Sequence, residues 1–148
     1  YFIGCVSISN NFSKFSKSLI IEFVKKNYYD RKIAQYIHPR KRFRVKLKKE
    51  DRMLVDLSED DVNKIDRLVD EMEPGNLRFP ILLKKYIKQN ARIVGFNVDP
   101  KFNNALDGLM LLDLLELPLD TLNQAVKEIN DENVVNAFVA KRMDYTNR

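Results

Sequence analysis

The 148-residue sequence contains no tryptophan, four glycines, one cysteine (Cys5) and one histidine (His38). A single cysteine excludes an internal disulfide and a multi-cysteine metal site, and with one histidine it argues against a structural zinc site. The glycines are not clustered, which argues against a phosphate-binding loop. Because a lone cysteine is typical of reducing compartments, we predict a cytoplasmic location.

Long apolar runs are also missing. No run approaches the roughly 20 residues that a membrane-spanning helix needs. The opening residues, YFIGCVSIS, lack the basic region and the small-residue cleavage site of a signal peptide. We expect residues 1–148 to form a single domain. Since they open on a strand-like run without Met, we expect this domain to be the C-terminal part of a larger protein.

The net charge of +5 is unevenly distributed. Residues 25–52 contain twelve Lys or Arg against three Asp or Glu, whereas residues 53–76 contain two against eight. In residues 40–49, Phe43, Val45 and Leu47 alternate with basic residues, which indicates either an edge strand with a basic face or a loose segment. We predict that this segment is the most positive surface. It would be either a solvated face or a contact for the phosphates of a membrane surface, nucleic acid or an acidic carrier protein.

Hydrophobic periodicity predicts an α+β fold. Alternating apolar residues indicate strands at 2–9 and 92–98. The continuous apolar run at 108–115 indicates either a buried strand or a short buried helix, and we favour the strand because the run is short. Helices are expected after a cap at Ser13 or Ser16, over residues 30–37, after a cap at Ser58, over residues 79–90 and 119–129, and after a cap at Asn130 or Asp131. In the helix at 79–90, the predicted apolar stripe consists of Phe79, Leu82, Leu83, Tyr86 and Ile87.

Three pieces of the sequence carry a resemblance: YFIGCVSIS (1–9), FPILLKKYIKQNARIVGFNVD (79–99) and DPKFNNALDGLMLLDL (99–114). Together they resemble the C-terminal half of GNAT-type acyltransferases, in the subgroup of ornithine-lipid N-acyltransferases and acyl-homoserine-lactone synthases. The resemblance is closest to bacterial proteins that carry a hemolysin label, and it covers about half of the chain.

The resemblance implies a GNAT-like mixed sheet with flanking helices, plus a helical insertion. Residues 1–9 would form the fifth strand of this sheet, and residues 92–98 and 108–115 its closing antiparallel pair. The first four strands would lie upstream, so the upstream half of the same acyltransferase is an expected partner. The implied activity is transfer of a fatty acyl group from acyl-carrier protein or acyl-CoA to an amine, in lipid synthesis of the ornithine-lipid type. No cofactor would be bound permanently, and the fragment alone would be inactive. The protein would act in the cytoplasm or at the inner face of the membrane.

The resemblance also implies candidate substrate-binding residues on the first strand. The backbone around Gly4, Cys5 and Ser7 would hold the pantetheine arm of the acyl donor. Cys5 itself is interpreted as a small hydrophobe rather than a nucleophile, because nothing in the sequence places His38 near it. No catalytic residue or catalytic base is assigned.

Three further residues are candidates for substrate binding. Lys84 is expected on the exposed side of its helix, as a solvated lysine or as a contact for the phosphate of a carrier. Either Asp99 or Asp107 would recognise the acceptor amine; alternatively, Asp99 shapes a turn before Pro100 and Asp107 anchors the loop.

A second hypothesis is a non-catalytic module that binds a membrane surface or nucleic acid through the basic segment. Nucleic acid is the weaker candidate, because the segment lacks the recurrent aromatic and basic pattern of single-strand binding platforms. The first strand also suggests a homo-oligomer, since an uncovered strand edge can pair with its own copy.

Overall fold

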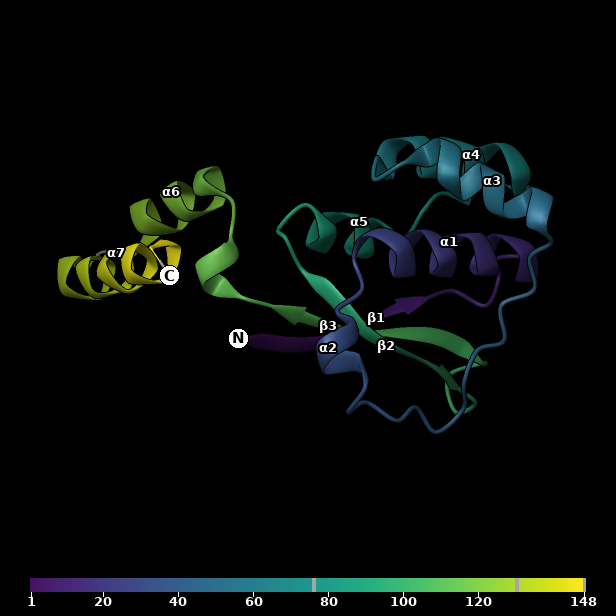
Figure 1. Ribbon diagram of the computed structural model, residues 1–148, viewed down its shortest axis with the longest axis horizontal. Helices are drawn as coiled ribbons and strands as arrows, with labels where there is room; N and C mark the ends of the chain where they lie inside the picture. The colour runs from purple at the N-terminus through teal and green to yellow at the C-terminus, as the bar shows by residue number, and fades with distance from the viewer. Residues whose placement is uncertain (76, 130, 148) are drawn as a thin grey trace.

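The computed structural model describes residues 1–75, 77–129 and 131–147. In this part of the chain, strands β1 (Phe2–Ile8), β2 (Arg92–Asp99) and β3 (Ala105–Leu112) form one antiparallel sheet in the order β1-β3-β2 (Figure 1). The predicted α+β class and the antiparallel pairing of the last two strands are confirmed. β3 begins at Ala105, three residues before the predicted start of the strand.

Helices of different lengths connect and flank the strands. They are α1 (Lys14–Asn27), α2 (Arg31–Ala34), α3 (Lys49–Ser58), α4 (Val62–Met72), α5 (Ile81–Ile87), the 3-10 turn η1 (Leu114–Glu116), α6 (Leu119–Glu128) and α7 (Glu132–Thr146). Ser13 caps α1 and Asp131 caps α7, as predicted, whereas the alternative cap Asn130 lies outside the described residues. Helix α7 continues to Thr146.

Helix α1 lies at the centre of the fold, between the sheet and the pair α3–α4 (Figure 1). Its buried residues therefore surround the helix axis and do not form a single stripe. Phe23 is fully buried. Its ring packs nearly edge-on against that of Phe79, which precedes α5, with 6.1 Å between the ring centroids. On the sheet, Val6, Ile8 and Leu106 join the same core.

The segment between α2 and α3 is extended but belongs to no strand, so the prediction of an edge strand is wrong. Its apolar residues Phe43, Val45 and Leu47 nevertheless pack against the core. The backbone N–H of Lys46 donates to the Ser18 hydroxyl at 3.1 Å, a contact with α1 and not with the sheet. The segment therefore lacks the ladder of backbone hydrogen bonds that defines a strand.

Ser58 does not cap a helix, which corrects the prediction. It is the last residue of α3, a helix that we did not predict, and its hydroxyl donates to the carbonyl of Leu54 at 2.9 Å. Helix α4 starts after Asp61, whose carboxylate accepts from the N–H of Asn63 at 2.8 Å.

Two other expectations about buried faces are corrected. Leu82 is 59% exposed, because the short helix α5 turns only Leu83 and Ile87 fully toward the core. In β2 the predicted alternation is interrupted by a register shift between Ile93 and Gly95, a β-bulge that leaves Val94 buried beside Ile93.

Candidate functional site: the outer sheet face

β1 is an edge strand with two different faces. It pairs with β3 on one side, and no described strand pairs with its other edge. Val6 and Ile8 point into the core, whereas Ile3 is 70% exposed and Cys5 is also exposed. We call the face away from α1 the outer sheet face. On β1 and β3 it consists of Ile3, Cys5, Ser7, Asp107, Leu109 and Leu111.

The polar side chains of this face come together in one row across the sheet. Ser7 lies opposite Asp107, and its hydroxyl donates to Asp107 Oδ1 at 2.6 Å. Asn97 of β2 is the next partner in the row. The Asp107 carboxylate retains further acceptor positions beyond Ser7, so it can accept a hydrogen bond from an ammonium group.

Cys5 and Ser7 have no histidine beside them within the described residues. His38 Nδ1 instead lies 3.2 Å from the carbonyl oxygen of Tyr36. A serine or cysteine nucleophile needs a base within hydrogen-bond reach, and Ser7 has only the carboxylate of Asp107. The arrangement can bind and orient a polar group, but it is not a nucleophilic relay.

The other candidate residues lie in different surroundings. Gly4 faces the core side, where an added Cβ would meet Met110 Cε at 3.6 Å, an ordinary contact. Asp99 lies further along β2, and its carboxylate accepts from the N–H of Lys101 at 2.8 Å, which is the turn-forming role.

Lys84 corrects an expectation, because it is half-buried and not exposed. Its ammonium group pairs with Asp66 at 2.6 Å on the helical side of the sheet. Asp66 also accepts from the N–H of Phe79 at 3.1 Å, so this pair holds α4 to the start of α5. Of the six candidates, the structure joins only Ser7 and Asp107 directly, with Cys5 on the same face.

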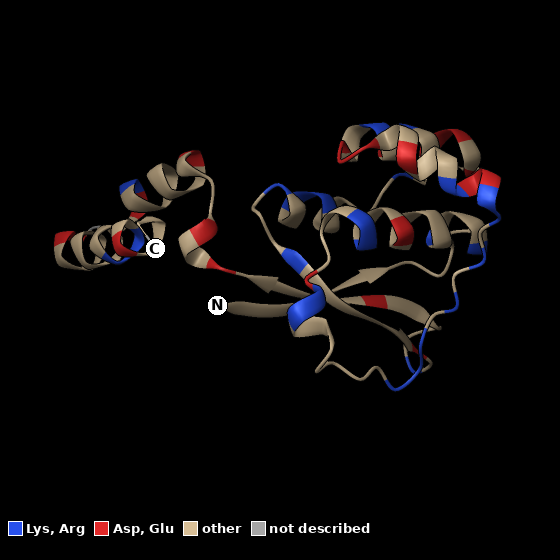
Figure 2. Ribbon diagram, viewed as in Figure 1, with Lys and Arg blue, Asp and Glu red and all other residues tan. Residues whose placement is uncertain are grey.

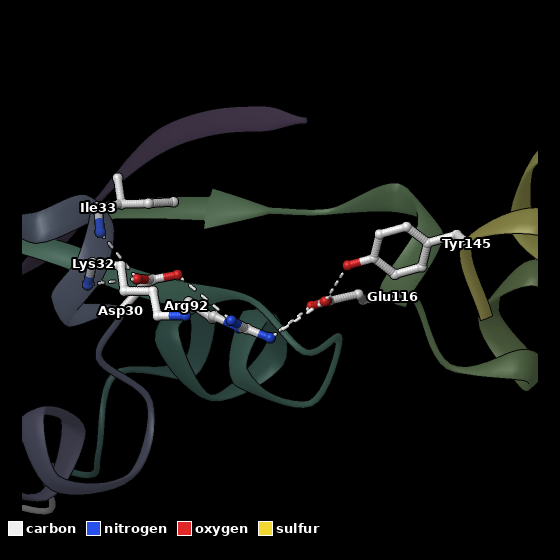
Figure 3. Close-up of polar contacts among 6 residues, drawn as sticks. All are labelled: Asp30, Lys32, Ile33, Arg92, Glu116 and Tyr145. Atoms are coloured by element: carbon white, nitrogen blue, oxygen red, sulfur yellow. Dashed lines mark hydrogen bonds and ion pairs between the residues drawn. The ribbon is translucent and has the colours of Figure 1, made fainter. Parts of the chain in front are cut away.

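A second polar cluster was missed by the sequence analysis (Figure 3). Arg92, at the start of β2, lies 3.5 Å from Asp30 and 3.0 Å from Glu116. Tyr145 of α7 donates to the other Glu116 oxygen at 2.9 Å, and this carboxylate raises the pKa of the tyrosine. The residues of this cluster lie far apart in the sequence, so no local motif indicates it.

This cluster borders a cavity of about 650 Å³ lined by Tyr28, Tyr29 and Asn90 among others. Its charged groups already contact one another, since the one guanidinium faces both carboxylates. Asp30 additionally accepts from the N–H groups of Lys32 and Ile33, each at 3.0 Å, and so caps α2. We therefore interpret the cluster as a structural junction between the sheet and α7.

Among the residues that the structure describes, no three His, Cys, Asp or Glu side chains are placed to hold a metal ion. Within the same residues, no helix has both the length and the apolar character needed to cross a bilayer. Comparison with known proteins identifies no matching family model, curated protein or solved structure.

Proposed function

We propose that this chain forms the C-terminal half of a GNAT-type N-acyltransferase site, which binds an acyl thioester along β1 and an acceptor amine at Asp107. The observation that carries the proposal is the open edge of β1 with the Ser7–Asp107 pair on the adjoining outer sheet face. The order of strand, central helix, helical insertion, helix and closing antiparallel strands agrees with the order that the sequence resemblance implies.

The open edge of β1 suits a thioester carried on pantetheine. Unpaired N–H and C=O groups of an edge strand can bind an extended chain of amides, as in strand addition. Acyl-carrier protein and acyl-CoA both present such an arm. In the proposed site the arm lies beside Gly4, Cys5 and Ser7, and the upstream half of the acyltransferase completes the other wall.

Asp107 is proposed to bind and orient the amine of the acceptor. In the reaction a nitrogen–carbon bond forms as the carbon–sulfur bond breaks, the thiol of the donor leaves, and the proton of the amine passes to a base. Positioning alone contributes strongly to such a step, since two bound reactants no longer have to meet in solution. Asp107 is assigned binding, and the base is left to the complete protein.

Binding of substrates is therefore the sharpest test. Octanoyl-CoA should raise the melting temperature of the chain in a concentration-dependent way, whereas CoA without an acyl group should act more weakly. Asp107→Asn should keep the response to octanoyl-CoA but lose binding of an amine probe such as ornithine. Asp144→Asn, an exposed carboxylate on α7, is the matched control. Equal responses to acyl-CoA and to an unrelated anionic nucleotide would overturn the proposal.

A further inference from the structure

The segment between α2 and α3 forms a row of cations on the surface. We call this row the basic rim and define it as Lys41, Arg42, Arg44, Lys46 and Lys48. All five are exposed, while the alternating residues Phe43, Val45 and Leu47 turn toward the core. Because the backbone is extended, the side chains of Arg42, Arg44, Lys46 and Lys48 project to the same side at intervals of roughly 6.5 Å, and Lys41 precedes this row.

The positive charge of the rim is not neutralised within the described residues. None of its five cations lies within ion-pair distance of a described carboxylate, and Figure 2 shows the blue segment passing along the edge of the fold. Two carboxylates of α4 pair with other cations instead, Asp66 with Lys84 and Asp70 with Arg78. The charge is therefore available to an anionic partner.

The rim is held in place before any partner binds. The N–H of Lys41 donates to Asn97 Oδ1 at 3.0 Å, and its carbonyl accepts from the N–H of Val98 at 2.8 Å. Further along, the N–H of Lys46 is bonded to Ser18. A surface that is already ordered loses little conformational entropy on binding.

An exposed aromatic side chain lies at the same end of the fold. Phe102, in the turn between β2 and β3, is 74% exposed and follows Lys101. The turn is joined to the rim by the ammonium group of Lys41, which donates to Asn104 Oδ1 at 3.2 Å. An apolar ring beside several cations is the combination that favours an interfacial position on an anionic bilayer.

We infer that the basic rim and Phe102 together form a docking surface for an anionic lipid bilayer. The cations contact the phosphate groups of the lipids, and the ring of Phe102 enters the boundary between headgroups and acyl chains. This surface adjoins the outer sheet face at the hydrogen bond between Lys41 and Asn97, but it does not depend on the proposed acyl transfer.

The observations favour lipid over nucleic acid. Single-strand binding requires aromatic rings on which bases can stack. The one aromatic residue among positions 41–48, Phe43, is half-buried against the core, with the Lys17 ammonium group 6.0 Å from its ring centre. Phe102 is thus the one exposed aromatic ring that the proposed surface includes, and a single ring does not give the succession of stacking positions that a single strand uses.

Vesicle sedimentation tests the charges. The chain should bind vesicles of phosphatidylcholine with about 30% phosphatidylglycerol, bind pure phosphatidylcholine weakly, and lose binding as salt is raised to about 0.5 M. Replacing Lys41, Arg42, Arg44 and Lys46 by Gln should lower the partition coefficient by about a hundredfold or more. The matched control replaces four exposed lysines elsewhere, Lys14, Lys85, Lys88 and Lys127, and should change it far less.

Fluorescence tests the position of Phe102. Since the sequence contains no tryptophan, Phe102→Trp introduces a single reporter whose emission should shift to the blue on anionic vesicles. Leu82→Trp, at an exposed position on α5, should not shift. The inference would be overturned if the two charge variants lost vesicle binding equally. It would also be overturned if the emission of Phe102→Trp did not shift when the chain is bound to vesicles. Tighter binding of a single-stranded oligonucleotide than of vesicles would assign the rim to nucleic acid instead.

Discussion

At the scale of single residues, Glu73 is the buried charge with the most specific surroundings. It follows α4 and is only 6% exposed, yet its carboxylate accepts from both the N–H and the hydroxyl of Ser13, at 2.9 and 2.6 Å. Burial alone would raise the pKa of Glu73, but these hydrogen bonds and the charge of Lys17 hold it below the ordinary value. Ser13 also caps α1, so one carboxylate joins the end of α4 to the start of the central helix.

Glu73→Gln should lower the free energy of unfolding at neutral pH by about 1.5–3 kcal/mol, because charge-assisted hydrogen bonds are lost. The lowered pKa means that the stabilisation by Glu73 is present above the pKa of the unfolded chain and is lost as the pH falls through the folded pKa. The difference between wild type and Glu73→Gln should therefore shrink under acid conditions. Urea denaturation at several pH values measures this, and a constant difference would contradict it.

At the scale of elements, helix α3 shows why a helix can escape prediction. Of its apolar residues only Val55 is buried, whereas Met53 and Leu57 are 59% and 72% exposed. The apolar pattern therefore gives no stripe. Besides the packing of Val55 in the core, tertiary ion pairs join the helix to α1, Lys26 with Asp56 and Arg52 with Glu22. Such partners lie too far away in sequence to be recognised from local periodicity.

The hairpin between β2 and β3 could be predicted because its signals are local. Asp99 and Pro100 end one apolar run, and the asparagines that follow can adopt left-handed backbone geometry. In the structure Asn103 and Asn104 have φ angles of 49° and 52°. The turn residues and the apolar runs on either side of them therefore predicted the hairpin that the structure shows.

Asn103 gives a direct test of this turn. Asn103→Val should lower the free energy of unfolding by about 1–2 kcal/mol, since a β-branched residue is strained at positive φ. Asn103→Gly should be close to neutral. Urea denaturation measures both, and Phe102→Val, at a neighbouring position without positive φ, serves as the control. If Asn103→Val and Phe102→Val were equally stable, backbone strain would not be the determinant.

At the scale of the whole molecule, the edge of β1 makes a prediction about assembly. Tyr1, Phe2 and Ile3 are 77%, 61% and 70% exposed, and the strand contains no charged residue or proline to block pairing. When neither the acyl donor nor the upstream half occupies this edge, we expect self-association through it. Sedimentation velocity should show a concentration-dependent dimer that Ile3→Lys weakens by about tenfold or more, while Leu82→Lys does not. A stable monomer at high concentration would contradict the expectation.

The candidate site was accessible to sequence reasoning only in part. Residues Ser7 and Asp107 were both named as candidates, but their direct contact depends on the register of β1 with β3. The junction of Arg92, Asp30 and Glu116 was not foreseen, because it requires α2, β2 and η1 to converge (Figure 3). Lys84 was misplaced for a similar reason, since helical spacing could not reveal its partner Asp66 in α4.

The junction attaches α7 to the sheet side of the fold through Tyr145, but no described residue of α6 or α7 is buried to hold the two helices there. The two helices extend away from the sheet (Figure 1). Their amides should therefore exchange with solvent deuterium by sub-global opening, well before the central helix α1 releases its own. We therefore expect residues 119–129 and 131–147 to behave as a separate cooperative unit, which a protease removes while the remainder stays folded.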